Sequence, residues 1–258
     1  MSDYCLDDPN KNDCITFTIS PILGQPEQVA EILDKKLPHD IKQMKHIPQE
    51  VINFIRDRKE FFSIVFILSD KQKSVNIQHL KADIATLSES PMLTEESRKK
   101  FKAFSQFLKK RNTNNKVLQN LCLISKTFGY VVEFLSIKHY TEAIYWFPDR
   151  DSVMEIANSI IKEIANLNIN NAIGRRRKIP KIGIAKEDSS TREFIFDPFI
   201  RYPDIITGTI SSVDLETHRV DKEKHGQLLK DAILDNPRIV LFQISPDLIH
   251  CSSLRSFK

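Results

Sequence analysis

Glycine, cysteine and long apolar stretches are all scarce in this chain of 258 residues, and each shortage excludes a class of protein. With six glycines and neither a GxGxxG nor a GxxxxGKS/T pattern, a phosphate-cradling loop is not expected. The sequence also lacks the GxSxG motif that presents a nucleophilic serine. Its four cysteines form no CxxC pair, so we expect reduced thiols and no structural zinc site.

The sequence also limits where the protein acts and what it binds. No stretch of about 18 apolar residues occurs, so no membrane span is expected. The first residues, MSDYCLDDPNKND, are acidic and lack the apolar core of a secretory signal. We therefore expect a cytoplasmic protein, or one that reaches its destination without such a signal. Nothing in the sequence indicates an oligomeric state.

The composition is that of a globular protein, with 41% hydrophobic and 28% charged residues. The net charge of +4 permits nucleic-acid binding without requiring it, because the clustering of charges matters more than their total.

The apolar pattern predicts an α/β fold with a mixed sheet flanked by helices. Residues 15–20, ITFTIS, alternate as in a strand, whereas residues 61–69, FFSIVFILS, are almost continuously apolar, as in a central strand covered on both faces. Strands are expected at 4–6, 14–23, 61–69, 143–147, 179–185 and 238–245, and helices at 25–37, 49–58, 151–167 and 221–235. A charged helical insertion at about 76–127 lies within what we expect to be a single domain spanning residues 1–258.

A few carboxylates stand where strands end or helices begin. Asp7 follows the first strand, Asp149 follows AIYWF, and Asp204 lies in the segment YPDIITGTISS. Carboxylates at several sheet ends can converge in space, and three of them stay ionised at close range only with a compensating cation. Mg²⁺ or Mn²⁺ suits such a set, because both take oxygen ligands and leave positions for water and phosphate.

Asp204 allows two interpretations. It can cap a helix that begins near Pro203, or it can serve as a metal ligand held against the sheet. The small residues after it, among them Gly208, favour a helix that lies close to a sheet. Both interpretations remain open from the sequence.

These segments resemble, in order, the motifs of a widespread family of uncharacterised proteins with a ribonuclease H-like fold. In that family the first strand ends in Asp-Glu-Ser-Gly, and a late helix begins with a motif like Ala-Asp-Leu/Tyr. Here YCLDDPN stands at the first motif, and HDIKQMKHIP resembles a Glu-x-Lys segment. IYWFPDRD resembles a later strand that ends in Asp-Arg, and YPDIITGTISS resembles the last motif. The resemblance covers most of the chain apart from the helical stretch near 76–115.

The resemblance implies a ribonuclease H-like domain that hydrolyses phosphodiester bonds of DNA or RNA with Mg²⁺ or Mn²⁺. Two such ions, about 3.5–4 Å apart, would activate water and stabilise the leaving oxygen. The implied catalytic and metal-binding carboxylates are Asp7, Asp8, Asp40, Asp149 and Asp204.

Basic residues are the implied contacts of the substrate phosphates. Lys42 and Arg150 stand at basic positions of the family motifs. Arg175, Arg176 and Arg177 belong to the run GRRRK, which can bind a nucleic-acid backbone or form a solvated loop.

Two departures from the family pattern leave a second function open. Residues 8–10, Asp-Pro-Asn, replace Glu-Ser-Gly, and Asp40 stands where the family has a longer glutamate. The alternative is a catalytically inactive scaffold, with the helical insertion or the basic loop as its binding face.

Overall fold

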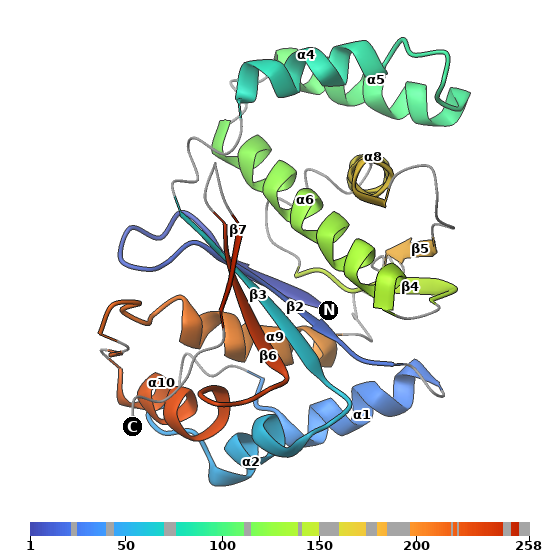
Figure 1. Cartoon of the computed structure of the whole chain (residues 1–258). Coiled ribbons are helices and arrows are strands. Elements are labelled where there is room, and N and C mark those ends of the chain that lie inside the picture. The colour runs from blue at the N-terminus through green and yellow to red at the C-terminus, as the bar shows by residue number, and fades with distance from the viewer. Residues whose placement is uncertain are drawn as a thin grey trace. The chain divides into compact units, whose positions relative to one another are not determined.

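The computed structural model describes residues 1–21, 25–39, 44–69, 76–110, 115–138, 141–149, 160–173, 180–184, 197–217, 219–220, 222–244 and 249–252 (Figure 1). The chain divides into two compact units, which we call the sheet unit and the helical unit. The sheet unit comprises Met1–Ser69, Tyr145–Asp149 and Ile184–Lys258, and the helical unit comprises Asp70–Ile144 and Arg150–Gly183.

The sheet unit is built on a five-stranded mixed sheet with the strand order β1-β2-β3-β6-β7. Its strands are β1 (Ser2–Cys5), β2 (Cys14–Ile19), β3 (Phe62–Leu68), β6 (Ile239–Ile244) and β7 (Ile249–Ser252). The first three strands form an antiparallel meander, β6 runs parallel to β3, and β7 runs antiparallel to β6. The predicted mixed sheet with flanking helices is therefore confirmed. β1 begins two residues before the predicted strand.

The register of the strands decides which side chains share a face. Asp3 is paired with Thr16, and Thr16 is paired with Val65, so these three side chains project from the same face. Ser2 and Phe17 project from the opposite face. The two faces therefore differ in polarity at β1 and β2, and the Asp3 face carries the polar groups.

Helices of the sheet unit cover the Asp3 face of the sheet (Figure 1). They are α1 (Pro26–Lys36), α2 (Gln49–Asp57), α9 (Asp197–Ile210), α10 (Glu223–Leu228) and the π-helical turn η1 (Leu229–Ile233). All five elements contribute side chains to one hydrophobic core, which includes Val65 and Leu241 of the sheet. α9 packs directly on β1 and β2, and this position brings its side chains to the polar end of the sheet.

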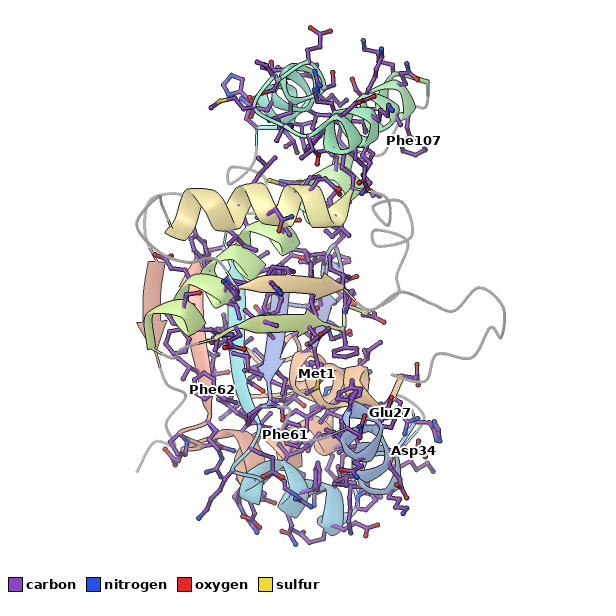
Figure 2. The ribbon with its side chains drawn as sticks, turned by 90° about the vertical axis from the view of Figure 1, so that its right-hand side faces the viewer. Met1, Glu27, Asp34, Phe61, Phe62 and Phe107 are labelled. Atoms are coloured by element: carbon purple, nitrogen blue, oxygen red, sulfur yellow. The ribbon has the colours of Figure 1, made fainter. Side chains whose placement is uncertain are left out.

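Polar contacts fix these helices to one another. Figure 2 labels Asp34 on α1, where its carboxylate meets the buried guanidinium of Arg201 from α9 at 2.8 Å. The same view labels Phe61 and Phe62 at the beginning of β3. Phe61 packs in the core against Tyr202 of α9, with 4.8 Å between the ring centroids.

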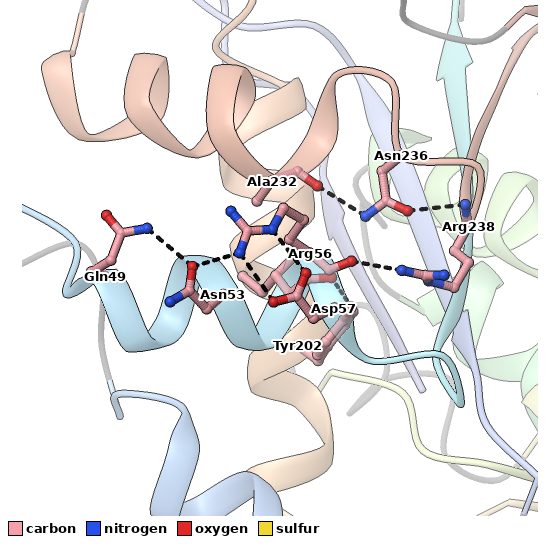
Figure 3. A network of polar contacts seen from close by, with 9 residues as sticks. Gln49, Asn53, Arg56, Asp57, Tyr202, Ala232, Asn236 and Arg238 are labelled. Carbon is pink, nitrogen blue, oxygen red and sulfur yellow. Dashed lines mark hydrogen bonds and ion pairs between the residues drawn. The ribbon is translucent and has the colours of Figure 1, made fainter.

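A second group of contacts connects α2, η1 and β6 (Figure 3). The guanidinium of Arg238 donates to the carbonyl of Arg56 at 2.6 Å. Asn236 donates to the carbonyl of Ala232 and accepts from the backbone N–H of Arg238. Tyr202 donates its hydroxyl to the carbonyl of Ile55, which joins α9 to the end of α2. These contacts hold the end of η1 at the beginning of β6.

The helical unit contains α4 (Ile77–Leu87), α5 (Glu95–Lys110), α6 (Asn115–Lys138) and α8 (Ile161–Ile173). The helical stretch predicted at 76–127 falls in this unit. In α5 the apolar Phe101, Phe104 and Leu108 are buried. α6 and α8 approach closely at Gly129, where an added Cβ would lie 3.3 Å from the carbonyl carbon of Asn168.

Two short strands form a second, smaller sheet. β4 (Ala143–Trp146) and β5 (Lys181–Ile184) form a two-stranded sheet, at which the chain passes between the two units. Of the helix predicted at 151–167, residues 151–159 lie outside the described residues, and α8 begins at Ile161. Within the described ranges, no helix has both the length and the apolar character needed to cross a membrane.

Candidate carboxylate site

The candidate site is centred on Asp3, a carboxylate in the middle of β1. Its side chain is only 6% exposed, although it is ionisable and lies near the beginning of the chain. It projects from the face on which α9 packs. A buried carboxylate in a strand needs polar or charged neighbours, because burial alone disfavours its ionised form.

Asp149 reaches the same place from a distant part of the chain. The backbone N–H of Ser2 donates to the carbonyl of Phe147 at 2.9 Å, and the N–H of Asp149 donates to the carbonyl of Ser2 at 3.0 Å. These two bonds set Ser2 beside Pro148 in a parallel bridge. Asp3 follows Ser2, and Asp149 follows Pro148 in the neighbouring segment. Because side chains alternate along a strand, Asp3 and Asp149 project from the same face. The hydroxyl of Tyr4 also donates to the Asp149 carbonyl at 3.0 Å.

Asp204 approaches this face from the middle of α9. The helix begins at Asp197, with Pro198 in its first turn, and it continues through Pro203. The interpretation of Asp204 as a helix cap is therefore wrong. The prediction failed because proline is common in the first turn of a helix, and the sequence therefore suggests a beginning near Pro203. The small residues after Asp204 do lie against the sheet. The thiol of Cys14 on β2 donates to the carbonyl of Thr207 at 3.7 Å.

The electrostatics of Asp3 connect the three carboxylates. Burial raises the pKa of Asp3 well above its ordinary value, and the negative charges of Asp204 and then Asp149 raise it further. The Thr207 hydroxyl and the Tyr4 backbone oppose this rise. The three aspartates are 146 and 55 residues apart along the chain, yet they share one electrostatic environment.

Two buried hydroxyls border Asp3. Thr16 is its direct partner across β1 and β2, and Thr207 is one turn beyond Asp204 on α9. The Thr207 hydroxyl interacts with the Asp3 carboxyl group and lowers its pKa. Thr16 is buried, and its hydroxyl makes no hydrogen bond to any of the described residues. Thr16 is therefore a hydrogen-bonding group available beside Asp3.

No protein-family model, curated protein or solved structure matches the chain. The site has to be interpreted from its own geometry. Among the residues with described positions, no group of three or more His, Cys, Asp or Glu side chains stands close enough to hold a metal ion. The three aspartates are thus electrostatic neighbours and not a closed ligand shell.

The two carboxylates expected at the end of the first strand lie in the turn between β1 and β2, and Asp7 is exposed there. The Asp7 backbone N–H donates to the carboxylate of Asp13 at 2.7 Å, with a left-handed φ of 68° at Asp7. The Asp8 carboxylate accepts from the backbone N–H of Asn10 and pairs with Lys11 at 3.6 Å. Asp8 thus stabilises the turn, whereas the charges with the largest effect on Asp3 are those of Asp204 and Asp149.

The remaining candidates lie outside the described residues. They are Asp40, Lys42, Arg150, Arg175, Arg176 and Arg177. Of the predicted site residues, the structure thus brings together Asp149 and Asp204, with Asp3 in the position for which Asp7 was expected.

Asp3 was missed because the apolar pattern around it is too short to identify a strand. The signal that could have found it lies in β2, where Thr16 and Thr18 alternate with apolar residues. Both threonines are buried, with exposures of 0% and 1%. A buried polar row on one strand predicts a polar residue opposite it on the next strand.

Proposed function

We propose that the chain is a metal-dependent phosphodiesterase of ribonuclease H-like architecture that acts on DNA or RNA. Asp3, Asp149 and Asp204 are its metal-binding carboxylates, and Mg²⁺ or Mn²⁺ is its cofactor. The observation that carries the proposal is the buried Asp3, whose pKa is raised by burial and by the charges of Asp204 and Asp149. Strongly shifted pKa values cluster at functional sites, so the raised pKa of the buried Asp3 favours a functional role.

The topology supports the ribonuclease H-like part of the proposal. An antiparallel meander, β1-β2-β3, carries a carboxylate on β1, and the segment at Pro148 runs parallel to β1 on its free side. A late helix, α9, packs on β1 and β2 and contributes the third carboxylate. This is the arrangement that the sequence resemblance implies, with Asp3 in place of Asp7.

The donor set fits a hard divalent cation. Carboxylate oxygens are preferred by Mg²⁺ and Mn²⁺, and the buried hydroxyls of Thr16 and Thr207 can orient a carboxylate or a water molecule. A bound ion would activate water and stabilise the leaving oxygen of the phosphodiester.

The residues of this chain have separate tasks in the proposed site. Asp3 holds the buried position on the rigid strand, and Thr207 orients its carboxyl group. The backbone bonds between Ser2 and Asp149 fix the second carboxylate beside the first. Asp204 is held by α9, whose position depends on the core and on the Arg201–Asp34 ion pair. Preorganisation of this kind reduces the reorganisation that a reaction requires.

The proposal is tested by hydrolysis of labelled single-stranded RNA and DNA with Mg²⁺ or Mn²⁺, with and without a chelator. We compare wild type with Asp3→Asn, Asp204→Asn and Asp7→Asn. The first two variants should lose activity by at least about a hundredfold, because each removes a charged ligand but keeps the shape of the side chain. Asp7→Asn should retain activity, since asparagine also tolerates the left-handed φ at this position.

The Asp7 variant makes the comparison decisive. Loss of activity in Asp7→Asn but not in Asp3→Asn would return the site to the end of β1. Activity that ignores both the chelator and Asp204→Asn would refute the metal mechanism. A wild-type protein with no activity on either nucleic acid would favour the inactive scaffold.

A further inference from the structure

The two compact units carry opposite charge. The helical unit contains 20 Lys and Arg against 10 Asp and Glu, which is a formal charge of +10. The sheet unit contains 18 Lys and Arg against 24 Asp and Glu, which is a formal charge of −6. The modest net charge of +4 hides this difference. Strong charge asymmetry between two parts of one chain is typical of a protein that binds a polyanion through its basic part.

The basic charge of α5 lies on its solvent-facing side. Lys102 and Lys109 are exposed, whereas Phe101, Phe104 and Leu108 of the same helix are buried. The two lysines are seven residues apart, which places them on one side of the helix about 10 Å apart along its axis. Figure 2 shows polar side chains that project outward from α4 and α5. The fold thus separates an apolar side of α5 from a basic side.

Within the described part of the helical unit, the acidic residues of α5 pair with other lysines. The acidic residues of α5, Glu95 and Glu96, are confined to its first turn and pair with Lys99 and Lys100. Lys102, Lys109 and the exposed Lys126 of α6 make no ion pair with any residue that has a described position. Their charge remains available to an anionic partner.

We infer that the helical unit is the nucleic-acid-binding part of the protein and contacts the phosphate backbone through Lys102, Lys109 and Lys126. The basic charge of the helical unit suits any polyanion, and the choice of nucleic acid as the partner rests on the proposed function. The acidic sheet unit repels a phosphate backbone at long range, so a substrate of the carboxylate site needs a separate basic surface to bind the protein. Contacts to phosphates supply affinity without sequence preference.

The test measures binding in the full-length Asp204→Asn protein with a chelator present, so that hydrolysis cannot interfere. Fluorescence anisotropy follows short labelled single-stranded RNA and DNA over a series of salt concentrations. The triple variant Lys102→Gln, Lys109→Gln, Lys126→Gln should weaken binding by at least about tenfold at low salt. It should also reduce the slope of log affinity against log salt by about 2, since each lost phosphate contact contributes about 0.7.

A matched variant carries the same change of charge in the sheet unit. Lys36, Lys45 and Lys59 are also exposed and make no ion pair with described residues, and their replacement by Gln should change affinity by less than about twofold. Equal losses in the two triple variants would mean that only total charge matters, which contradicts the inference. Unchanged binding in the helical-unit variant would also overturn it.

Two further arms separate this inference from its alternatives. If polyglutamate or phosphatidylserine vesicles bind as tightly as RNA and depend equally on Lys102, Lys109 and Lys126, the surface is not one for nucleic acid. If wild type fails to cleave but binding still depends on the three lysines, the proposed function fails and this surface stands. If cleavage occurs and the triple variant binds and cleaves normally, the surface is wrong and the proposed function stands.

Discussion

The sheet unit and the helical unit use charge in different ways. The sheet unit buries Asp3, Arg201, Lys224 and His225 among its core elements. Among the described residues of the helical unit, Glu163 is a buried charged residue, and its carboxylate pairs with Lys100 at 2.7 Å. Buried charges lower stability unless they are paired, whereas exposed charges have little effect on it. Among the described residues, the sheet unit thus carries several of its charged side chains in its interior, whereas the helical unit carries most of them at its surface.

The largest effect is expected from a pair of core variants that test whether the two units are separate in stability. Phe101 of α5 and Ile206 of α9 are buried, with exposures of 1% and 0%. Phe101→Ala should cost the helical unit about 3–5 kcal/mol, and Ile206→Ala should cost the sheet unit about 2–5 kcal/mol. Trp146, the only tryptophan, lies in the sheet unit, so its fluorescence reports that unit during denaturation. Far-UV circular dichroism reports the helices of both units.

The two variants should shift different unfolding transitions if the two units are separate in stability. Phe101→Ala should shift the circular dichroism transition and leave the Trp146 transition within about 0.5 kcal/mol of wild type. Ile206→Ala should shift the Trp146 transition. Replacement of Ile32, which is 42% exposed on α1, is the surface control and should have an effect within about 0.5 kcal/mol. Coincident shifts of both signals in Phe101→Ala would mean that the chain unfolds as one cooperative unit.

The strands and helices could largely be predicted because their periodicity reports burial. The apolar run at 61–69 became β3, and the helix expected at 25–37 became α1, Pro26–Lys36. Periodicity identifies which residues share a face, but not whether that face is covered. Thr16 and Thr18 alternate with apolar residues in the sequence, and in the structure both are buried, on a strand against which α9 packs.

The site was less accessible to prediction, since it depends on contacts between distant segments. Asp149 and Asp204 could be selected because each adjoins an apolar segment. Asp3 was not selected, because the expected strand began after it and because its burial depends on α9 and on the bridge between Ser2 and Pro148. The opposite charges of the two units were equally hidden, since the helical unit is assembled from two separate stretches of sequence.

A smaller and opposite effect on stability is expected at the carboxylate site. Asp3→Asn should stabilise the metal-free protein by about 1–2 kcal/mol at neutral pH, because it removes a buried carboxyl group whose ionisation is opposed by burial and by the charges of Asp204 and Asp149. The folded pKa of Asp3 is raised above its ordinary value of 3.8, so the folded protein binds this proton more tightly than the unfolded chain. Wild-type stability should therefore fall as pH rises from 3.8 through the raised pKa.

Thermal denaturation at several pH values measures this effect. The advantage of Asp3→Asn should vanish as the pH falls below 3.8, because Asp3 then becomes protonated in the unfolded chain as well as in the folded protein. Mg²⁺ or Mn²⁺ should stabilise wild type but not the variant, because a ligand stabilises only the state that binds it. A variant that is less stable than wild type at neutral pH would show that Asp3 serves the fold and not a functional site.

The smallest effect on stability is expected from the pH dependence that the buried His225 of the sheet unit causes. His225 on α10 is buried, and its Nδ1 lies 3.2 Å from the Ser212 hydroxyl. Burial, followed by the charges of Lys224, Lys222 and Lys11, lowers the pKa of His225 from 6.5 to about 4. The unfolded chain therefore takes up this proton near pH 6.5, while the folded protein does so only near pH 4. Wild type should lose about 1 kcal/mol as pH falls through this window, after allowance for solvent screening.

His225→Gln should remove that loss, and urea denaturation between pH 4 and pH 6.5 measures the difference. His79, exposed on α4 of the helical unit, is the matched control for the loss of a histidine side chain in the variant His79→Gln. Asp3 acts in the opposite direction over part of this range, so the His225 variant is best compared in the Asp3→Asn background. If both histidine variants alter the pH dependence equally, the contrast between a sheet unit with buried charges and a helical unit with exposed charges does not hold for histidine.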